Sequence, residues 1–372
     1  MSRRGSTEPA SNDTGRLGLP TGVFPFGNLN AITDVAGVHV GHVTAIEGND
    51  IRTGATAVLP HGGNLLQDRV PAGLAVANGH GKMIGATQIV EIGEIETPIV
   101  LTNTLAVPRA ADAILDWTLS QAGNASVRSI NPVVGETNDG RLNAIETRPL
   151  TVARIRHAID TAAEGPVVEG CIGAGTGTVA MGWKAGIGTS SRVLPNRFGG
   201  HTIGALVQSN FPGSLRLAGV PVGRLLDSSG VEAKHADDHL AGSIMIVLAT
   251  DAPLSDRNLT RLARRAFAGV ARTGASFSNG SGDYAIAFST AESVRRSPAR
   301  RAEEATLREL PNERISPLFL AAIEATEEAI VRSLLQAESM TGRDGTTIAA
   351  LPRDRTAALL REYGVTKGDR LV

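Results

Sequence analysis

The sequence of 372 residues contains few aromatic side chains, one cysteine and almost no net charge. Because Phe, Trp and Tyr make up only 3% of it, the core must be built from closely packed Val, Ile, Leu and Ala, as in sheets whose backbones approach one another. The single cysteine, Cys171, excludes an internal disulfide bond. With 36 basic and 37 acidic residues, the chain has no net field to attract nucleic acid, and we expect no nucleic-acid partner.

Long apolar runs are also missing. No run reaches the roughly 18 apolar residues of a membrane helix, and residues 1–15 lack the apolar core of a secretory signal. We therefore expect a cytoplasmic protein without a membrane partner. The histidines form no His-Glu-x-x-His motif, and residues 173–177 lack the Lys-Ser ending of a phosphate-binding loop. We accordingly expect neither a metal nor another cofactor.

Glycine and apolar residues are abundant, with 43 glycines and 42% apolar residues. Short β-branched runs bounded by Gly, Asn and Pro predict strands, and apolar residues at helical spacing predict helices. We expect strands over residues 32–43, 56–60, 73–78, 243–248 and 284–289 and helices over 107–121, 152–163, 255–270, 316–337 and 353–363. Without strict βαβ alternation, this order favours an α+β fold with two sheets between helix layers. Residues 1–20 are expected to form a mobile tail, and residues 21–372 a single domain.

The step from Gly242 to Ser243 begins an apolar run directly after a charged linker, residues 227–240. If the chain is cut there, Ser243 carries both a hydroxyl nucleophile and an α-amine, whose pKa of about 7.7–8.0 suits a general base. Gly242 permits backbone angles that would press its carbonyl against the Ser243 hydroxyl. The ordinary interpretation of Gly-Ser before a strand is the end of a turn; the exposed linker favours cleavage.

Three further residues suit acyl transfer. Ser281 and Asp283 lie two apart in a glycine-rich turn, so in an extended chain they face the same side, where a carboxylate and a hydroxyl can orient protons. The alternative is a Ser-Gly-Asp turn in which the aspartate binds its own backbone. Asn210 ends an apolar strand, where its amide can hold an oxyanion or simply belong to a turn.

Two charged residues are candidates for substrate contacts. Lys184 lies among glycines, where its ammonium can touch a substrate carbonyl or carboxylate, or remain a solvated loop lysine. Glu136 follows a strand close to Asp139, and it can pair with a substrate amine or belong to a solvated acidic turn.

Together these segments resemble the DmpA-type aminopeptidases, the L-aminopeptidase/D-alanine esterase-amidase family that includes β-peptidyl aminopeptidases. The matching motifs are residues 30–43, 182–190, 207–211, 242–243 and 249–254. The resemblance implies a four-layer αββα sandwich of the DmpA/ornithine-acetyltransferase type. It also implies self-cleavage between Gly242 and Ser243 into chains 21–242 and 243–372, and a homo-oligomer, which we expect to be a tetramer of two-chain units.

The resemblance implies roles for individual residues. Ser243 is the nucleophile, Ser281 and Asp283 support it, and Asn210 binds the oxyanion. Family members usually have glutamate in the place of Asp283, and some have a substrate-binding tyrosine in the place of Asn138. Phe211-Pro-Gly also replaces the usual Phe-Gly after Asn210.

We therefore predict an autoprocessed N-terminal-serine hydrolase that releases N-terminal residues from small peptides, amides or esters. One alternative is a hydrolase of ω-amino-acid oligomers of the nylon type. Another is an acyltransferase of the ornithine-acetyltransferase type, although those relatives have threonine in the place of Ser243. A third is a catalytically silent homologue, which the departures at Asn138 and Asp283 motivate.

Overall fold

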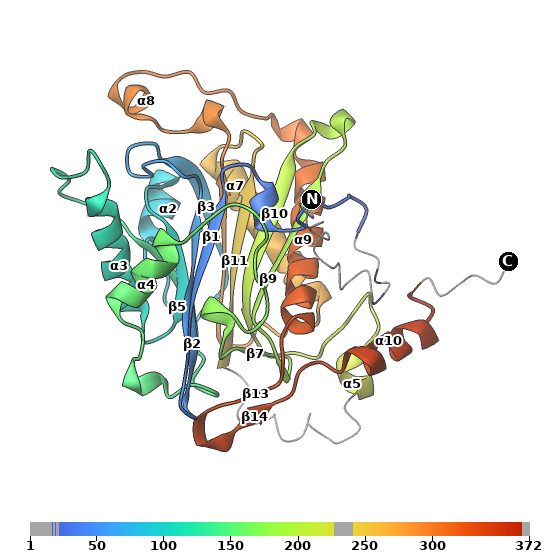
Figure 1. Ribbon diagram of the computed structural model, residues 1–372. Helices are drawn as coiled ribbons and strands as arrows, with labels where there is room; N and C mark the ends of the chain where they lie inside the picture. The colour runs from blue at the N-terminus through green and yellow to red at the C-terminus, as the bar shows by residue number, and fades with distance from the viewer. Residues whose placement is uncertain (1–16, 18, 20–21, 227–240, 367–372) are drawn as a thin grey trace, which may run out of the picture.

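Two β-sheets lie face to face between two layers of helices (Figure 1). The structure is a computed structural model that describes residues 17, 19, 22–226 and 241–366. The first sheet has the order β1-β2-β5-β6, and the second has the order β4-β3-β12-β11-β10-β9. The four-layer αββα sandwich expected from the sequence is thereby confirmed.

The strands of the two sheets come from all parts of the chain. The first sheet contains β1 (His39–Glu47), β2 (Ile51–Leu59), β5 (Ile99–Asn103) and β6 (Val133–Thr137). The second contains β4 (Glu94–Ile95), β3 (Val70–Gly79), β12 (Gly280–Ser289), β11 (Ala241–Thr250), β10 (Thr202–Asn210) and β9 (Ile187–Val193). Two short hairpins, β7 (Val179–Ala180) with β8 (Trp183–Lys184) and β13 (Met340–Thr341) with β14 (Thr347–Ile348), lie outside the sheets.

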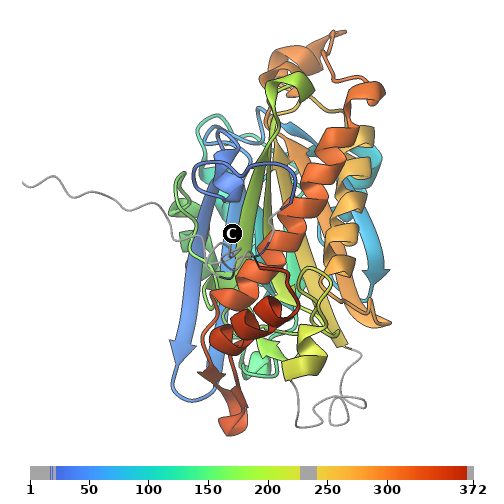
Figure 2. The ribbon, with the colours of Figure 1, turned by 90° about the vertical axis from the view of Figure 1, so that its right-hand side faces the viewer.

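Helices cover the outer face of each sheet. The first sheet is covered by α3 (Val107–Ser120) and α4 (Val152–Asp160), and the second by α7 (Asp256–Arg272) and α9 (Ser316–Leu335). Figure 2 shows α7 and α9 side by side along the second sheet. With α10 (Arg353–Glu362), all five predicted helices are present. The shorter α2 (Ala86–Ile92), α5 (Val222–Leu226) and α8 (Pro298–Ala302) were not predicted.

Strand β11 is buried on both faces, as its lack of polar alternation predicts. Ile244, Ile246 and Leu248 join the apolar core beneath α7 and α9. The alternating residues Met245 and Val247 join the core between the two sheets. Since side chains alternate along a strand, the odd-numbered residues of β11 face the space between the sheets.

The predicted strand over residues 32–43 is wrong in its first half. The chain forms a 3-10 turn over Ile32–Asp34, and β1 starts only at His39. The carboxylate of Asp34 accepts hydrogen bonds from the backbone amides of Leu29, at 2.9 Å, and Ala31, at 3.1 Å. Aspartate competes well for nearby backbone amides, and here those bonds hold a turn in place of a strand.

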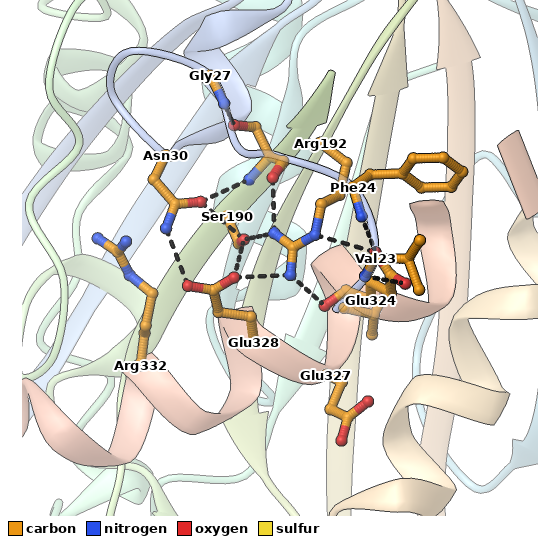
Figure 3. A network of polar contacts seen from close by, with 12 residues as sticks. Val23, Phe24, Gly27, Asn30, Ser190, Arg192, Glu324, Glu327, Glu328 and Arg332 are labelled. Carbon is orange, nitrogen blue, oxygen red and sulfur yellow. Dashed lines mark hydrogen bonds and ion pairs between the residues drawn. The ribbon is translucent and has the colours of Figure 1, made fainter. Parts of the chain in front are cut away.

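A buried ion cluster connects α9, β9 and the N-terminal segment (Figure 3). The guanidinium of Arg192 contacts Glu324 at 3.3 Å and Glu328 at 2.7 Å, with all three side chains nearly inaccessible. Glu324 also accepts the backbone amide of Val23 at 2.8 Å, and Glu328 accepts the side-chain amide of Asn30 at 2.9 Å. Because each carboxylate has several donors, the cluster satisfies its buried charges and ties residues 23–30 to the helix layer.

Two predicted segments fall mainly outside the described residues. The linker over residues 227–240 is one, and most of the tail over residues 1–20 is the other. Within that tail, Leu17 and Leu19 are described, and they pack against the core beneath α9. Among the helices that the structure describes, none is long and apolar enough to cross a membrane. The same part of the chain contains no group of three or more His, Cys, Asp or Glu side chains suited to a metal ion.

Candidate active site

Ser243 lies in the middle of the second sheet, where the ends of three strands meet. In the register of the sheet it pairs with Asn210 of antiparallel β10 on one side and with Gly282 of parallel β12 on the other. Ser243 is 6% exposed. By the alternation of β11, Ser243 and Met245 face the space between the sheets. The candidate nucleophile is therefore held on both sides by strand pairing.

Gly242 is required by close packing. It lies in extended β11, and a Cβ added to it would come 2.4 Å from Cδ of Pro212 and 2.9 Å from the carbonyl oxygen of Asn210. We expected an unusual backbone angle from this glycine; it has no positive φ. The Phe211-Pro212 sequence after β10 instead leaves no room for a side chain beside the predicted cleavage point.

The Ser243 hydroxyl receives a hydrogen bond from the backbone amide of Gly282, at 3.1 Å. Gly282 is tightly enclosed, because a Cβ there would lie 2.8 Å from Cα of Gly81 and 3.2 Å from Oγ of Ser243. A backbone donor aimed at the hydroxyl oxygen leaves the hydroxyl hydrogen free for transfer to a base.

Ser281 and Asp283 form a buried pair on β12. The Ser281 hydroxyl donates to Oδ1 of Asp283 at 2.6 Å, and each residue is 1% exposed. Burial raises the pKa of the Asp283 carboxyl, while hydrogen bonds from Ser281 and from the backbone of Ile244 oppose that rise. Oδ2 of Asp283 has no hydrogen-bond partner among the described residues.

The pair lies on the opposite face of the sheet from the Ser243 hydroxyl. Asp283 alternates with Tyr284, which joins the core between the sheets, and it shares its face with Ala285, which joins the core beneath the helices. Asp283 pairs in register with Ile244, directly after Ser243. In the uncut chain the pair is therefore close to the backbone of the nucleophile and separated from its side chain.

Asn210 is fixed by two hydrogen bonds. Its Oδ1 accepts the backbone amide of Val179 at 2.9 Å, and its Nδ2 donates to the backbone carbonyl of Asn138 at 3.0 Å. The second hydrogen on Nδ2 stays available, since a primary amide has two. The side-chain oxygen of Asn138 accepts the amide of Gly140 at 2.9 Å, whereas the hydrogen bond from Asn210 ends on the backbone carbonyl of Asn138.

Glu136 lies near the end of β6 with both carboxylate oxygens engaged. Oε1 accepts the backbone amide of Lys82 at 3.0 Å, and Oε2 accepts the hydroxyl of Thr104. Glu136 is 3% exposed. A Cβ added to Gly81 would lie 3.4 Å from Oε1 of Glu136 and 3.2 Å from Cα of Gly282. Gly81 thus separates Glu136 from the strand pair that holds Ser243.

Lys184 is completely buried, and its ammonium donates to the backbone carbonyls of Gly175, at 3.2 Å, and Ala185. Burial lowers the pKa of its side chain to about 8. Lys184 pairs in the β7–β8 hairpin with Val179, whose amide holds Asn210. Lys184 is therefore connected to Asn210 through the strand partner Val179, and its ammonium binds backbone carbonyls.

Sequence reasoning missed the burial of Asp139, which we treated as part of an acidic turn. Its carboxylate accepts the hydroxyl of Thr53 and the side-chain amide of Asn143, and it is 2% exposed. Burial raises the pKa of Asp139 to about 7 against the effect of these hydrogen bonds. Thr53 comes from β2, 86 residues away, and no local pattern indicates that contact.

The chain is similar to known proteins over nearly its full length. The family model described as peptidase family S58 matches residues 30–348. The β-peptidyl aminopeptidase BapA of Sphingosinicella microcystinivorans is 40% identical over 369 residues, which cover 93% of this chain and 91% of that protein.

Two solved structures have the same arrangement. A β-aminopeptidase from Burkholderia sp. is 40% identical with a TM-score of 0.86, covering 94% of this chain and 99% of its own. The L-aminopeptidase D-Ala-esterase/amidase from Ochrobactrum anthropi is 40% identical with a TM-score of 0.87, covering 95% of this chain and 99% of its own. That protein is a prototype for the serine aminopeptidases and a variant of the Ntn-hydrolase fold.

Proposed function

Because the chain belongs to peptidase family S58, we propose that it cleaves its own Gly242–Ser243 bond and then uses Ser243 as its nucleophile. The family, the relatives and the Ntn-hydrolase fold make it an aminopeptidase or amidase of the N-terminal-nucleophile class. The observation that carries the proposal is the position of Ser243 between Asn210 and Gly282, with its hydroxyl oxygen bound by a backbone amide.

Self-cleavage would proceed by an acyl shift. The Ser243 hydroxyl attacks the carbonyl of Gly242, the peptide C–N bond breaks, and an ester to Oγ forms as the nitrogen takes up a proton. Water then hydrolyses the ester, leaving a carboxylate on Gly242 and a free α-amine on Ser243. The products, residues 1–242 and 243–372, would stay associated because β11 and β12 of the second chain pair with β10 and β3 of the first chain, respectively.

Substrate hydrolysis would reuse the same hydroxyl. The α-amine of Ser243 takes the hydroxyl proton as Oγ attacks the substrate carbonyl, and the free amide hydrogen of Asn210 binds the oxyanion. The proton passes to the leaving amine, the acyl-enzyme forms, and water releases the acid. Ser281 and Asp283, close to the backbone of Ile244, would hold the new α-amine.

Glu136 would bind the amine of the substrate. A carboxylate held by two donors keeps lone pairs for a third, and it attracts an ammonium group strongly in a buried site. The turn of Asn138 would form the neighbouring wall. Lys184 remains a predicted substrate contact, although it would have to give up one of its two carbonyl partners to reach a ligand.

Small peptides or amides are the proposed substrates. The cytoplasmic location and the assembly into a tetramer of two-chain units stay predictions from the sequence. The relatives named for β-peptidyl and for L-amino-acid substrates are each 40% identical to this chain. Identity therefore does not separate α- from β-amino acids, and both must be tested.

The proposal is tested by the hydrolysis of L-alanine and β-alanine p-nitroanilides. We expect the wild-type chain to release p-nitroaniline from at least one of them and Ser243→Ala to release none. Ser255→Ala is the matched control, since Ser255 precedes α7 without a side-chain capping bond, and it should behave as wild type. Equal activity in Ser243→Ala and wild type would contradict the proposal. If an added acceptor amine speeds the release of p-nitroaniline and takes up the acyl group in competition with water, the chain is a transferase.

A further inference from the structure

The phenol of Tyr284 holds the backbone of Gly81 through two hydrogen bonds. Its hydroxyl donates to the carbonyl oxygen of Gly81 at 3.0 Å and accepts the amide of Gly81 at 3.2 Å. Tyr284 is 6% exposed and packs in the core between the sheets. A hydroxyl both donates and accepts, so phenylalanine could fill the same space without making either bond.

Gly81 fits in a narrow space between two parts of the candidate site. A Cβ on Gly81 would lie 2.9 Å from Cε2 of Tyr284, 3.2 Å from Cα of Gly282 and 3.4 Å from Oε1 of Glu136. Gly282 in turn donates its backbone amide to Oγ of Ser243. The position of Gly81 therefore sets the spacing between Glu136 and the nucleophile strand.

The residue after Gly81 reaches Glu136 directly. The backbone amide of Lys82 donates to Oε1 of Glu136 at 3.0 Å, while the Thr104 hydroxyl binds the other oxygen. One of the two donors that orient the carboxylate thus belongs to the segment that Tyr284 holds. If residues 81–82 move, this carboxylate oxygen loses its fixed donor.

Tyr284 also keeps its proton. Burial raises the pKa of the phenol, the bond to Gly81 opposes this, and the charges of Glu136 and Asp283 add to the rise. Because an ionised phenol could not donate to the Gly81 carbonyl, the surrounding carboxylates preserve the donor.

We propose that Tyr284 is a positioning residue that fixes Glu136 relative to Ser243 by clamping Gly81 and Lys82. This inference rests on the proposed function, in which Glu136 binds the substrate amine. It assigns Tyr284 to amine recognition, that is, to the preference for substrates with a free N-terminal ammonium group. The clamp acts on substrate binding and leaves the attack by the Ser243 hydroxyl unchanged.

The test is Tyr284→Phe in the full chain, with Tyr363→Phe as the matched control. The sequence has only these two tyrosines, and Tyr363 is 50% exposed. Loss of neutral hydrogen bonds predicts a rise in KM for the aminoacyl p-nitroanilide of about 3- to 10-fold. We expect kcat to stay within about twofold, and self-cleavage, which shows that the variant folds, to proceed as in wild type.

A double-mutant cycle with Glu136→Gln separates positioning from a merely structural role. If Tyr284 acts through Glu136, Tyr284→Phe should raise KM in the wild-type background and add little in the Glu136→Gln background. An equal rise in both backgrounds, no rise in either, or a loss of self-cleavage would overturn the inference while the proposed function stands. A wild-type chain that neither cuts itself nor hydrolyses either alanine anilide would overturn both.

Discussion

Asn210 stands directly opposite Ser243 in the antiparallel pairing of β10 with β11, and its amide is anchored by Val179 and Asn138. The anchors use the side-chain oxygen and one amide hydrogen, so one hydrogen remains. Strand pairing thereby places one potential oxyanion donor beside the nucleophile without any movement of the backbone.

Replacement of Asn210 by alanine should reduce kcat by about 10²- to 10³-fold, the usual effect of losing one oxyanion donor. KM should change little, because the donor acts on charge that develops in the transition state. The exposed Asn196, at the start of the 3-10 turn before β10, provides the control Asn196→Ala. Steady-state kinetics that show a raised KM with unchanged kcat would assign Asn210 to substrate binding instead.

Gly282→Ala should slow self-cleavage by about 10-fold or more. The added methyl would come within 2.8 Å of Gly81 and 3.2 Å of Oγ of Ser243, and overpacking of this kind costs about 1–3 kcal/mol. Gly79 is its register partner on β3, where a methyl would meet only Cγ1 of Val76 at 3.9 Å. Gly79→Ala should therefore cut at the wild-type rate. Intact-mass time courses give the rate of self-cleavage of each variant. Equal rates in Gly282→Ala and Gly79→Ala would mean that the close contact between residue 282 and Ser243 is unimportant for cleavage.

Asp139→Asn should flatten the pH dependence of stability. The pKa of Asp139 is raised by burial from 3.8 to about 7, so between about pH 4 and pH 7 the folded chain holds a proton that the unfolded chain releases. The free energy of unfolding therefore falls as pH rises through this window, by up to about 4 kcal/mol, and stays at its reduced level above it.

Urea unfolding of the Ser243→Ala chain, with and without Asp139→Asn, measures this effect on a single polypeptide. The asparagine variant should be more stable than its parent at pH 8 and similar to it at pH 4. Asp112→Asn on the exposed face of α3 is the control and should shift neither value. A pH dependence that persists unchanged in the Asp139→Asn chain would show that another group causes it.

Local sequence patterns predicted the layers well because each depends on residues close in the chain. Helix α9 follows from apolar side chains at helical spacing, and β11 follows from an apolar run long enough to be buried on two faces. The predicted strand over residues 32–43 was too long at its start, because a hydropathy pattern contains no information about the bonds from nearby backbone amides to Asp34.

The finer geometry of the site depends on contacts between distant strands. Tyr284 and Gly81 are 203 residues apart, and neither shows a local signal for the other. Alternation along β12 correctly placed Ser281 beside Asp283. It could not show that Ser243, on the preceding strand in the sequence, faces the other side, because that depends on the parallel register of β11 with β12. Such relationships require the assembled sheet.

Intact-mass spectrometry of the purified chain beside Ser243→Ala tests the central claim most directly. We expect the 38.6 kDa chain to be converted into fragments of about 25 kDa and about 13–14 kDa, the smaller beginning with Ser243, and the variant to stay whole. A wild-type chain that remains a single species on prolonged incubation, or that is cut equally in Ser243→Ala, would contradict it.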